Sequence, residues 1–219
     1  MSTRGKTAIV AVGGNALIID DQHQSIPDQY KAAAVSSRYV ADMVEAGVTV
    51  ILTHGNGPQV GFILRRSGIA KGEVPEVPVD YADADTQGAI GYMFQRALYN
   101  EFRRRGLKRK VVAVVTQVLV DRDDPALANP TKPIGAHMDQ EVAQSLAGKF
   151  GWVVKEDAGR GWRRVVGSPK PKRIIELDII ASLVEHGHIV ISCGGGNGSS
   201  PPTWPTTRMR PSSSCTALG

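Results

Sequence analysis

Apolar residues along this chain fall into short continuous runs, separated by longer segments with helical spacing. The runs cover residues 6–12, 48–52, 111–120 and 188–192. Runs that are apolar at nearly every position are typical of parallel strands covered on both faces. The segments with helical spacing cover residues 28–46, 59–67, 81–105, 138–150 and 174–185. Because strands alternate with helices, the pattern predicts an α/β protein with a mainly parallel sheet.

The stretch between residues 121 and 171 breaks this alternation. Three prolines and a glycine fall within residues 121–137 and predict a long loop without a regular element. Two short apolar segments, 152–154 and 162–166, flank a glycine-containing turn and predict a β-hairpin. We therefore expect residues 121–171 to form a small subdomain that protrudes from the sheet.

The end of the chain has a different composition. Residues 197–219 are rich in Ser, Thr and Pro and have no periodic apolar pattern. Such a segment cannot bury enough apolar surface to offset the entropy that is lost on ordering, so we expect it to be disordered. The predicted folded domain therefore covers residues 1–196.

Three of the predicted strands run directly into glycine-rich turns. These turns are Gly13-Gly14-Asn15, Gly55-Asn56-Gly57 and Gly194-Gly195-Gly196. Glycine permits positive φ and close approach by a ligand, and the carboxyl ends of parallel strands meet at the edge where ligands bind. Pro58 suits the first turn of a helix after the second turn, and a helix N-terminus favours anions. Tight chain reversal alone explains one such turn, whereas three at one edge predict a phosphate-sized glycine cradle.

Composition and charge narrow the class of partner. The hydrophobic fraction of 42% and the charged fraction of 21% are those of a globular protein. The net charge of +5 is too mild to indicate nucleic-acid binding, and it is compatible with small anionic substrates. No apolar run approaches the length of a membrane span. Two cysteines, Cys193 and Cys215, make no metal or disulfide framework, so a reducing cytoplasm is the default expectation.

Six longer strings carry more specific information. They are VAVGGNAL, LTHGNGPQVG, DADTQGAIGYMFQRAL, VVTQVLVDRDDPALANPTKPIG, EDAGRGWRRVVGSPKP and IVISCGGG. In this order they resemble the motifs of the carbamate kinases, a family of the amino-acid kinase superfamily, from residue 7 to about residue 196. The resemblance implies an α/β/α sandwich, a homodimer, and phosphoryl transfer between ATP and carbamate with Mg²⁺. It also implies the usual direction of the family, in which carbamoyl phosphate from arginine catabolism converts ADP to ATP.

Individual residues of these strings can be assigned roles in this chemistry. The catalytic candidates are Lys132, Gly14 and Asn15, and the candidates for binding phosphate or carbamate are Gly13, Gly55, Asn56, Gly57 and Arg160. Backbone N–H groups and the asparagine amides would donate to the anion, because phosphoryl transfer depends on positioning and electrostatic stabilisation. Lys132 in PTKPIG matches the family's substrate-side lysine, and the flanking prolines suggest a lid. Arg160 stands between two glycines, where it can approach an anion, contact solvent or contact a partner.

Several nearby polar residues have a plainer interpretation. His54 is expected to be a hydrogen-bonded structural histidine rather than a base. Asp83 and Asp85 are expected to be acids at a helix start rather than metal ligands, and no metal ligand is predicted. Gln87 is equally compatible with the site and with a dimer face. The basic run at residues 103–110 is expected to be a solvated helix end.

After Gly196 the sequence departs from the family. A carbamate kinase continues there with a part that binds the nucleotide and supplies a lysine–aspartate pair. This chain continues instead with NGSSPPTWPTTRMRPSSSCTALG, as after a shifted reading frame or a truncation. We therefore expect the carbamate side of the machinery to be present and kinase activity of this chain to be small or absent. Two other functions stay open: a non-catalytic module that binds carbamoyl phosphate or a similar anion, and a different amino-acid kinase that acts on an amino-acid carboxylate.

Overall fold

A parallel β-sheet forms the centre of the protein. The computed structural model describes residues 6–13, 16–20 and 22–195. All four strands of the sheet are parallel, in the order β1-β2-β9-β3. The strands are β1 (Thr7–Val12), β2 (Thr49–His54), β9 (Ile189–Ile191) and β3 (Val111–Ala113). The predicted α/β class with a mainly parallel sheet is therefore confirmed.

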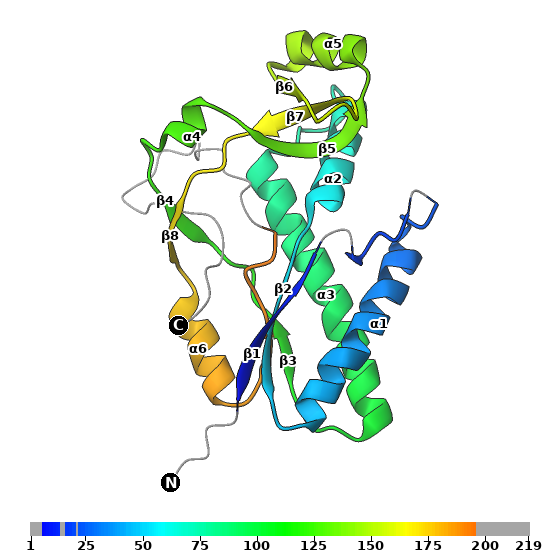
Figure 1. Cartoon of the computed structure of the whole chain (residues 1–219), viewed down its shortest axis with the longest axis vertical. Coiled ribbons are helices and arrows are strands. Elements are labelled where there is room, and N and C mark those ends of the chain that lie inside the picture. Colours follow the sequence, from blue (N-terminus) through cyan, green and yellow to red (C-terminus); the bar gives the residue numbers. More distant parts are fainter. Residues whose placement is uncertain (1–5, 14–15, 21, 196–219) are drawn as a thin grey trace.

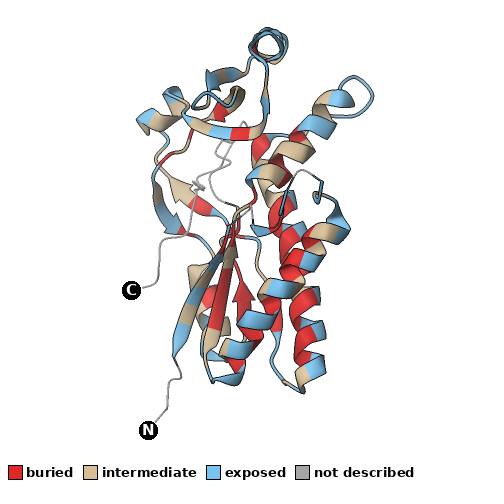
Figure 2. Ribbon diagram, turned by 45° about the vertical axis from the view of Figure 1, so that its right-hand side comes forward, coloured by how far each residue is buried: buried red, intermediate tan, exposed pale blue. Residues whose placement is uncertain are grey.

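Helices cover both faces of this sheet (Figure 1). α1 (Ile26–Glu45) and α3 (Val79–Arg105) lie together on one face, and α6 (Leu177–Glu185) lies on the other. Figure 2 shows buried residues along the facing sides of the helices and the sheet. Leu52 of β2 and Phe94 of α3 are both fully buried in the main apolar core. The layers are those of the predicted α/β/α sandwich.

Residues at the helix ends explain where two of these helices begin and end. Ser25 caps α1, since its side chain accepts a hydrogen bond from the backbone N–H of Asp28. Gly106 ends α3 in the left-handed conformation, with φ of 71°. Within α3, Gly91 allows close packing on β3, because a Cβ at Gly91 would lie 2.7 Å from the Cβ of Ala113.

β1 differs from the predicted strand that is covered on both faces. It lies at the edge of the sheet, and exposed and less exposed residues alternate along it. Ile9 is 45% exposed, whereas Val50 and Leu52 of the inner strand β2 are fully buried. The expectation of full coverage therefore holds for β2 and β9 and is wrong for β1.

The predicted strand over residues 111–120 is divided in two. β3 belongs to the parallel sheet, whereas β4 (Val118–Val120) pairs antiparallel with β8 (Pro171–Ile174). The division falls at Thr116, whose backbone N–H donates to Oε1 of Gln87 at 2.8 Å instead of to a neighbouring strand. A run of valines does not reveal such a change of partner, and β8 is not apparent in the sequence pattern.

A three-stranded antiparallel sheet lies at one end of the molecule, with the order β5-β7-β6 (Figure 1). Its strands are β5 (Lys132–Met138), β6 (Val153–Glu156) and β7 (Trp162–Val166). α5 (Gln140–Phe150) connects β5 to β6, and α2 (Gly57–Ile69) lies beside β5. The predicted hairpin over residues 152–166 is confirmed by the pairing of β6 with β7.

The prediction of an irregular loop over residues 121–137 is wrong. This stretch contains the short helix α4 (Pro125–Ala128) and most of β5. Its prolines are compatible with both elements, because Pro125 occupies the first turn of α4 and Pro133 lies in an edge strand. Proline is disfavoured in helix interiors and central strands, but the first turn of a helix and an edge strand both accept it.

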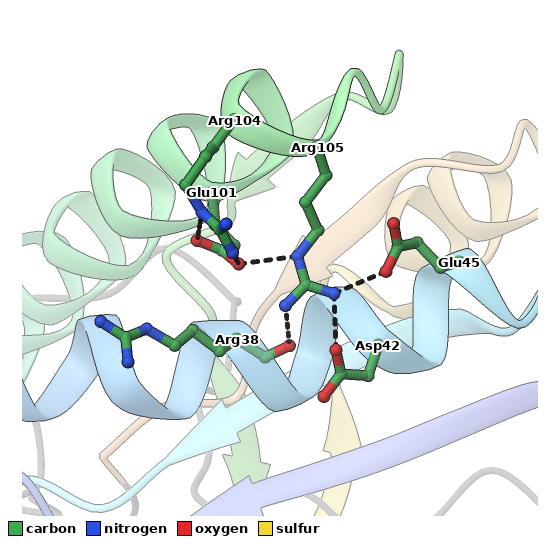
Figure 3. Close-up of polar contacts among 6 residues, drawn as sticks. All are labelled: Arg38, Asp42, Glu45, Glu101, Arg104 and Arg105. Atoms are coloured by element: carbon green, nitrogen blue, oxygen red, sulfur yellow. Dashed lines mark hydrogen bonds and ion pairs between the residues drawn. The ribbon is translucent and has the colours of Figure 1, made fainter.

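An ion-pair network joins the C-terminal parts of α1 and α3 (Figure 3). The Arg105 guanidinium donates to carboxylates of Glu101 at 2.7 Å, Asp42 at 2.5 Å and Glu45 at 2.6 Å. It also donates to the backbone oxygen of Arg38 at 3.1 Å. The basic run is therefore not simply a solvated helix end, since the Arg105 side chain is only 14% exposed.

Two observations bear on the remaining expectations. Among residues 6–13, 16–20 and 22–195, no helix has the length and apolarity needed to cross a membrane. The segment 197–219, which is expected to be disordered, lies outside the described residues.

Candidate functional site

The sheet places the three glycine turns side by side. β2 lies between β1 and β9, with Val12 opposite His54 and Leu52 opposite Ile191. The backbone N–H of Gly55 donates to the oxygen of Val12, and the N–H of Gly195 donates to the oxygen of His54, both at 2.8 Å. The second and third turns are thus each bonded to the end of the neighbouring strand. The described part of the glycine cradle consists of Gly13, Gly55, Asn56, Gly57, Gly194 and Gly195, whereas the candidates Gly14 and Asn15 lie outside the described residues.

The second turn leads into a helix that is suited to anions. α2 begins at Gly57 with Pro58 in its first turn, and the side chain of Asn56 makes no capping hydrogen bond. Backbone N–H groups in a first helical turn have no intrahelical acceptor, and the helix dipole favours negative charge there. A Cβ at Gly57 or Gly13 would meet no atom within 4 Å. Packing against the described part of the chain therefore does not require glycine at these positions, whereas close approach by a ligand would explain it.

The third turn needs glycine for packing. A Cβ at Gly194 would overlap the imidazole ring of His54, and a Cβ at Gly195 would lie 2.5 Å from Oδ1 of Asp83. His54 is 5% exposed and Nδ1 lies 3.2 Å from the backbone oxygen of Gly55. Burial lowers the pKa of the His54 imidazole. These contacts support the structural role expected of His54.

Asn56 is bonded to α3 rather than directed at an open site. Its Nδ2 donates to Oδ1 of Asp83 at 2.7 Å and to Oγ1 of Thr86 at 2.6 Å, and the residue is 6% exposed. Both amide hydrogens are used in these bonds. The expectation that the Asn56 side chain donates to substrate therefore does not match this geometry, and its observed role is to hold the second turn against α3.

Asp83 is part of the site, which the sequence interpretation missed. α3 begins at Val79, so Asp83 lies in its second turn instead of capping its start. The carboxylate accepts from Nδ2 of Asn56 and, at 3.2 Å, from Nε2 of Gln87. Burial raises the pKa of Asp83, and these two donors and the Lys132 charge act in the opposite direction. The spacing of Asp83, Thr86 and Gln87 was the available signal, because residues three and four apart share one helix face.

Gln87 extends this network beneath the site. Its Oε1 accepts from the N–H of Thr116 at 2.8 Å, and its Nε2 donates to the oxygen of Thr116 at 3.2 Å. Oγ1 of Thr116 accepts from the N–H of Cys193, just after β9, at 2.9 Å. Two locations were predicted for Gln87, the site and a dimer face. Gln87 is 9% exposed and donates to Asp83, which supports the location next to the site. The network joins the second glycine turn, α3 and the end of β9.

Lys132 begins β5, and two glycines hold that strand against α2. A Cβ at Gly61 of α2 would lie 2.6 Å from the Cα of Gly135, which itself has φ of 73°. This backbone-to-backbone approach places Lys132 near enough to Asp83 for their charges to interact. Burial lowers the pKa of Lys132, and the Asp83 carboxylate acts in the opposite direction. The structure therefore places the Lys132 charge within electrostatic range of Asp83, which contacts the second and third turns of the glycine cradle.

Arg160 lies away from the glycine cradle. It is in the turn between β6 and β7, its side chain is 65% exposed, and it donates to Oδ1 of Asp157 at 3.2 Å. This turn adjoins the pairing of Trp162 with Met138, whereas Lys132 pairs with Val166 at the other end of β7. The four residue steps from Trp162 to Val166 separate the two ends of β7 by about 13 Å. The structure therefore does not bring Arg160 together with Lys132.

The two arginines after Arg160 are used within the antiparallel sheet. Nε of Arg163 donates to the oxygen of Gly135 at 3.1 Å, and its NH1 donates to Asp157 at 3.1 Å. The Arg164 guanidinium lies 4.7 Å from the centre of the Trp152 ring, a cation–π arrangement. Arg163 thus bonds β7 to β5, the strand that carries Lys132, whereas Arg164 packs on the residue that precedes β6.

The described residues do not form a magnesium site by themselves. Within these ranges no group of three or more His, Cys, Asp or Glu side chains is placed to hold a metal ion. We therefore derive no step through a metal ion held by these residues.

Curated relatives of the chain share nearly half of its residues or more. A carbamate kinase of Pyrococcus furiosus is 50% identical over 194 residues, which are 88% of this chain and 62% of the relative. A carbamate kinase-like protein of Escherichia coli, YahI, is 48% identical over 191 residues, with 86% and 60% covered. The chain thus spans about three fifths of the length of these relatives. No protein-family model matches it.

Solved structures of the same kind share its fold. The carbamate kinase of Giardia lamblia bound to citric acid superposes with a TM-score of 0.83 at 39% identity, covering 90% of this chain and 63% of that one. The same enzyme bound to AMP-PNP gives a TM-score of 0.78. These similarities establish the amino-acid kinase fold for this chain.

Proposed function

Because this chain is homologous to the carbamate kinases over nearly nine tenths of its length, we propose that it carries the carbamoyl phosphate side of such an enzyme. The proposed reaction of the whole protein moves the phosphoryl group of carbamoyl phosphate to ADP. The bond from phosphorus to the carbamate oxygen breaks, and a bond to a β-phosphate oxygen of ADP forms. The products are ATP and carbamate, and the reaction is reversible.

One observation carries the proposal: three glycine turns end neighbouring parallel strands, and the charge of Lys132 acts on Asp83 beside two of these turns. The second turn leads into the first turn of α2, whose backbone N–H groups have no intrahelical acceptor and stabilise phosphoryl oxygens without moving during the reaction. The Lys132 ammonium adds a positive charge on a strand that is packed tightly against α2. Positioning and charge stabilisation of this kind are what phosphoryl transfer requires of a protein.

Several finer points belong to the same proposal. The nucleotide would be ADP or ATP, in keeping with the AMP-PNP complex of the Giardia lamblia enzyme. Mg²⁺ would enter with the nucleotide phosphates, which commonly supply several of its ligands. We propose a cytoplasmic homodimer that uses carbamoyl phosphate from arginine catabolism. Arg160 is retained as a phosphate ligand only for a state in which the hairpin turn has moved toward the glycine cradle.

Calorimetric titration with carbamoyl phosphate in the absence of nucleotide tests the proposal. We expect saturable binding by the 219-residue chain, and weaker binding by Lys132→Ala. A hydrogen bond to a charged group is worth about 1.5–3 kcal/mol, so the Kd should rise roughly 10- to 150-fold. Absence of binding, or binding that Lys132→Ala leaves unchanged, would contradict the proposal.

A coupled assay for ATP formation from ADP and carbamoyl phosphate separates the alternatives. We expect little or no turnover by this chain, which spans about three fifths of its relatives. Tight binding of carbamoyl phosphate without turnover, both by this chain and by a longer form that spans the full length of its relatives, would favour the non-catalytic anion-binding module. Phosphorylation of an amino-acid carboxylate instead of carbamate would favour the other amino-acid kinase.

A further inference from the structure

A carboxylate lies between two of the three turns of an anion cradle. Oδ1 of Asp83 is 2.7 Å from Nδ2 of Asn56 in the second turn, and it would be 2.5 Å from a Cβ at Gly195 in the third. A carboxylate repels phosphate, so Asp83 is a poor ligand for the phosphoryl group. Its position therefore calls for a part of the substrate that donates hydrogen bonds.

The Asp83 carboxylate is held rigidly and has acceptor capacity left. Asn56 donates to Oδ1 and Gln87 donates to Oδ2, and Gln87 is fixed in turn by its two bonds to Thr116. An ionised carboxylate offers about four acceptor positions, so roughly two stay available beyond these bonds. Asp83 is only partly buried, so its carboxylate is not enclosed on every side. A donor pair that arrives at the glycine cradle can reach it.

Carbamoyl phosphate carries such a pair at the end opposite its phosphate. Its amino group has two N–H donors and is attached to the carbonyl carbon, which also bears the oxygen that bridges to phosphorus. We propose that Asp83 is a specificity-determining residue that accepts hydrogen bonds from this amino group while the glycine turns and Lys132 hold the phosphate. Asp83 thereby selects carbamoyl phosphate over an acyl phosphate that has a methyl group in the same place. This inference rests on the proposed function.

The selection follows from the cost of leaving a polar group unpaired. A methyl group against Asp83 would displace water and supply no donor, whereas an amino group completes the carboxylate's hydrogen bonds. Sites built to bind an N–H group reject analogues that lack it by large factors. Since Asp83 is only partly buried, we expect a preference of at least about 10-fold, toward the lower end of such effects.

Two hydrolysis-resistant probes measure this preference. Phosphonoacetamide and acetonylphosphonate are nearly the same size and carry the same phosphonate, but one ends in an amino group and the other in a methyl group. The Lys132 contribution is common to both and cancels in the ratio of their Kd values. Calorimetric titration of the wild-type chain should show tighter binding of phosphonoacetamide.

The decisive variant is Asp83→Asn, with Asp85→Asn as its matched control. Asp85 lies two residues further along α3 and is exposed, so its variant removes the same charge away from the site. We expect Asp83→Asn to reduce the ratio to within about 3-fold, because the charge that disfavours the methyl probe is lost together with an acceptor. We expect Asp85→Asn to leave both Kd values unchanged. A purely structural role for Asp83 would weaken both probes equally and leave the ratio intact.

The outcomes separate this inference from the function on which it rests. Wild-type chain that binds both probes without preference, or a ratio that Asp83→Asn leaves unchanged, overturns the role of Asp83 alone. Wild-type chain that binds neither probe nor carbamoyl phosphate overturns the proposed function as well. If Asp83→Asn does not fold by circular dichroism, the ratio for the wild-type chain still decides, supplemented by Asp83→Glu, which should shift it by moving the carboxylate.

Discussion

The contact between Gly194 and His54 shows how a single missing side chain shapes this protein. A Cβ at Gly194 would overlap all three near atoms of the imidazole ring, which is itself 5% exposed and has little room to move. The glycine therefore sets the distance between the ends of β9 and β2. The same distance places the third turn of the glycine cradle beside the second.

We predict that Gly194→Ala destabilises the fold by about 1–3 kcal/mol, the usual cost of overpacking. Gly88→Ala in α3 is the matched control, since a Cβ there meets no atom within 4 Å. Alanine in that exposed helix interior should stabilise the protein by about 0.5–1 kcal/mol. Urea denaturation measures both changes in the free energy of unfolding. A Gly194→Ala variant that is as stable as wild type, or more stable, would show that the third turn is not packed as described.

Glu101 gives a second prediction at the scale of the residue. Hydrogen bonds from Arg104 and Arg105 lower the pKa of Glu101 from 4.5 to about 2. A carboxylate with a depressed pKa stabilises the fold above its unfolded pKa, and this contribution is lost as the pH falls through the folded pKa. The free-energy difference between wild type and Glu101→Gln should therefore be constant above pH 5 and shrink between about pH 4.5 and pH 2. Denaturation midpoints over this range test it, and a difference independent of pH would exclude the ion-pair network as its source.

At the scale of the element, the packing of β5 on α2 determines where Lys132 lies. Gly61 and Gly135 let the two backbones approach so closely that no side chain fits between them. These glycines belong to the GNGPQVG and PTKPIG strings, which the sequence places more than 70 residues apart. One string thus supplies the second glycine turn and also the surface that holds the lysine of the other.

We predict that Gly61→Ala weakens carbamoyl phosphate binding by displacing β5. A Cβ at Gly61 would lie 2.6 Å from the Gly135 Cα, so the strand and Lys132 must shift. The Kd should rise about 10-fold, and Gly61→Ala should add little to Lys132→Ala because both act through the same ammonium. Gly68→Ala in the same helix is the control, since its Cβ meets nothing within 4 Å. Additive effects of Gly61→Ala and Lys132→Ala would contradict this mechanism.

The elements show which physical signals the sequence carries. Long periodic segments such as α1 and α3 were predicted because their apolar stripe follows the helical period over many residues. The division of residues 111–120 was not predicted, because it depends on a hydrogen bond from Thr116 to Gln87 on another element. β5 was missed because proline was taken to exclude a strand, and an edge strand accepts it.

At the scale of the whole molecule, the site depends on the order of the strands. The glycine turns after β1, β2 and β9 meet because β9 pairs with β2 across 135 or more residues of sequence. Apolar runs predict parallel strands and glycines predict turns at one edge, so the position of the glycine cradle could be inferred. The side chains that complete the glycine cradle could not be inferred. Asp83, for example, is brought there by the packing of α3, whereas the sequence assigned it to a helix start. Asn56 and Arg160 were assigned to the anion from their neighbours in sequence, and the structure bonds them elsewhere.

A titration of ¹⁵N-labelled chain with carbamoyl phosphate, followed by amide chemical shifts, tests the position of the site most directly. We predict that the largest change occurs at the backbone amide of Gly57, with further changes at Gly55 and Gly195, whose N–H groups donate to Val12 and His54, and smaller changes along β5 near Lys132. We predict no comparable change at Arg160 in the hairpin turn. Saturable changes centred on that turn, or changes absent from the glycine amides, would contradict the claim that the ends of β1, β2 and β9 form the binding site.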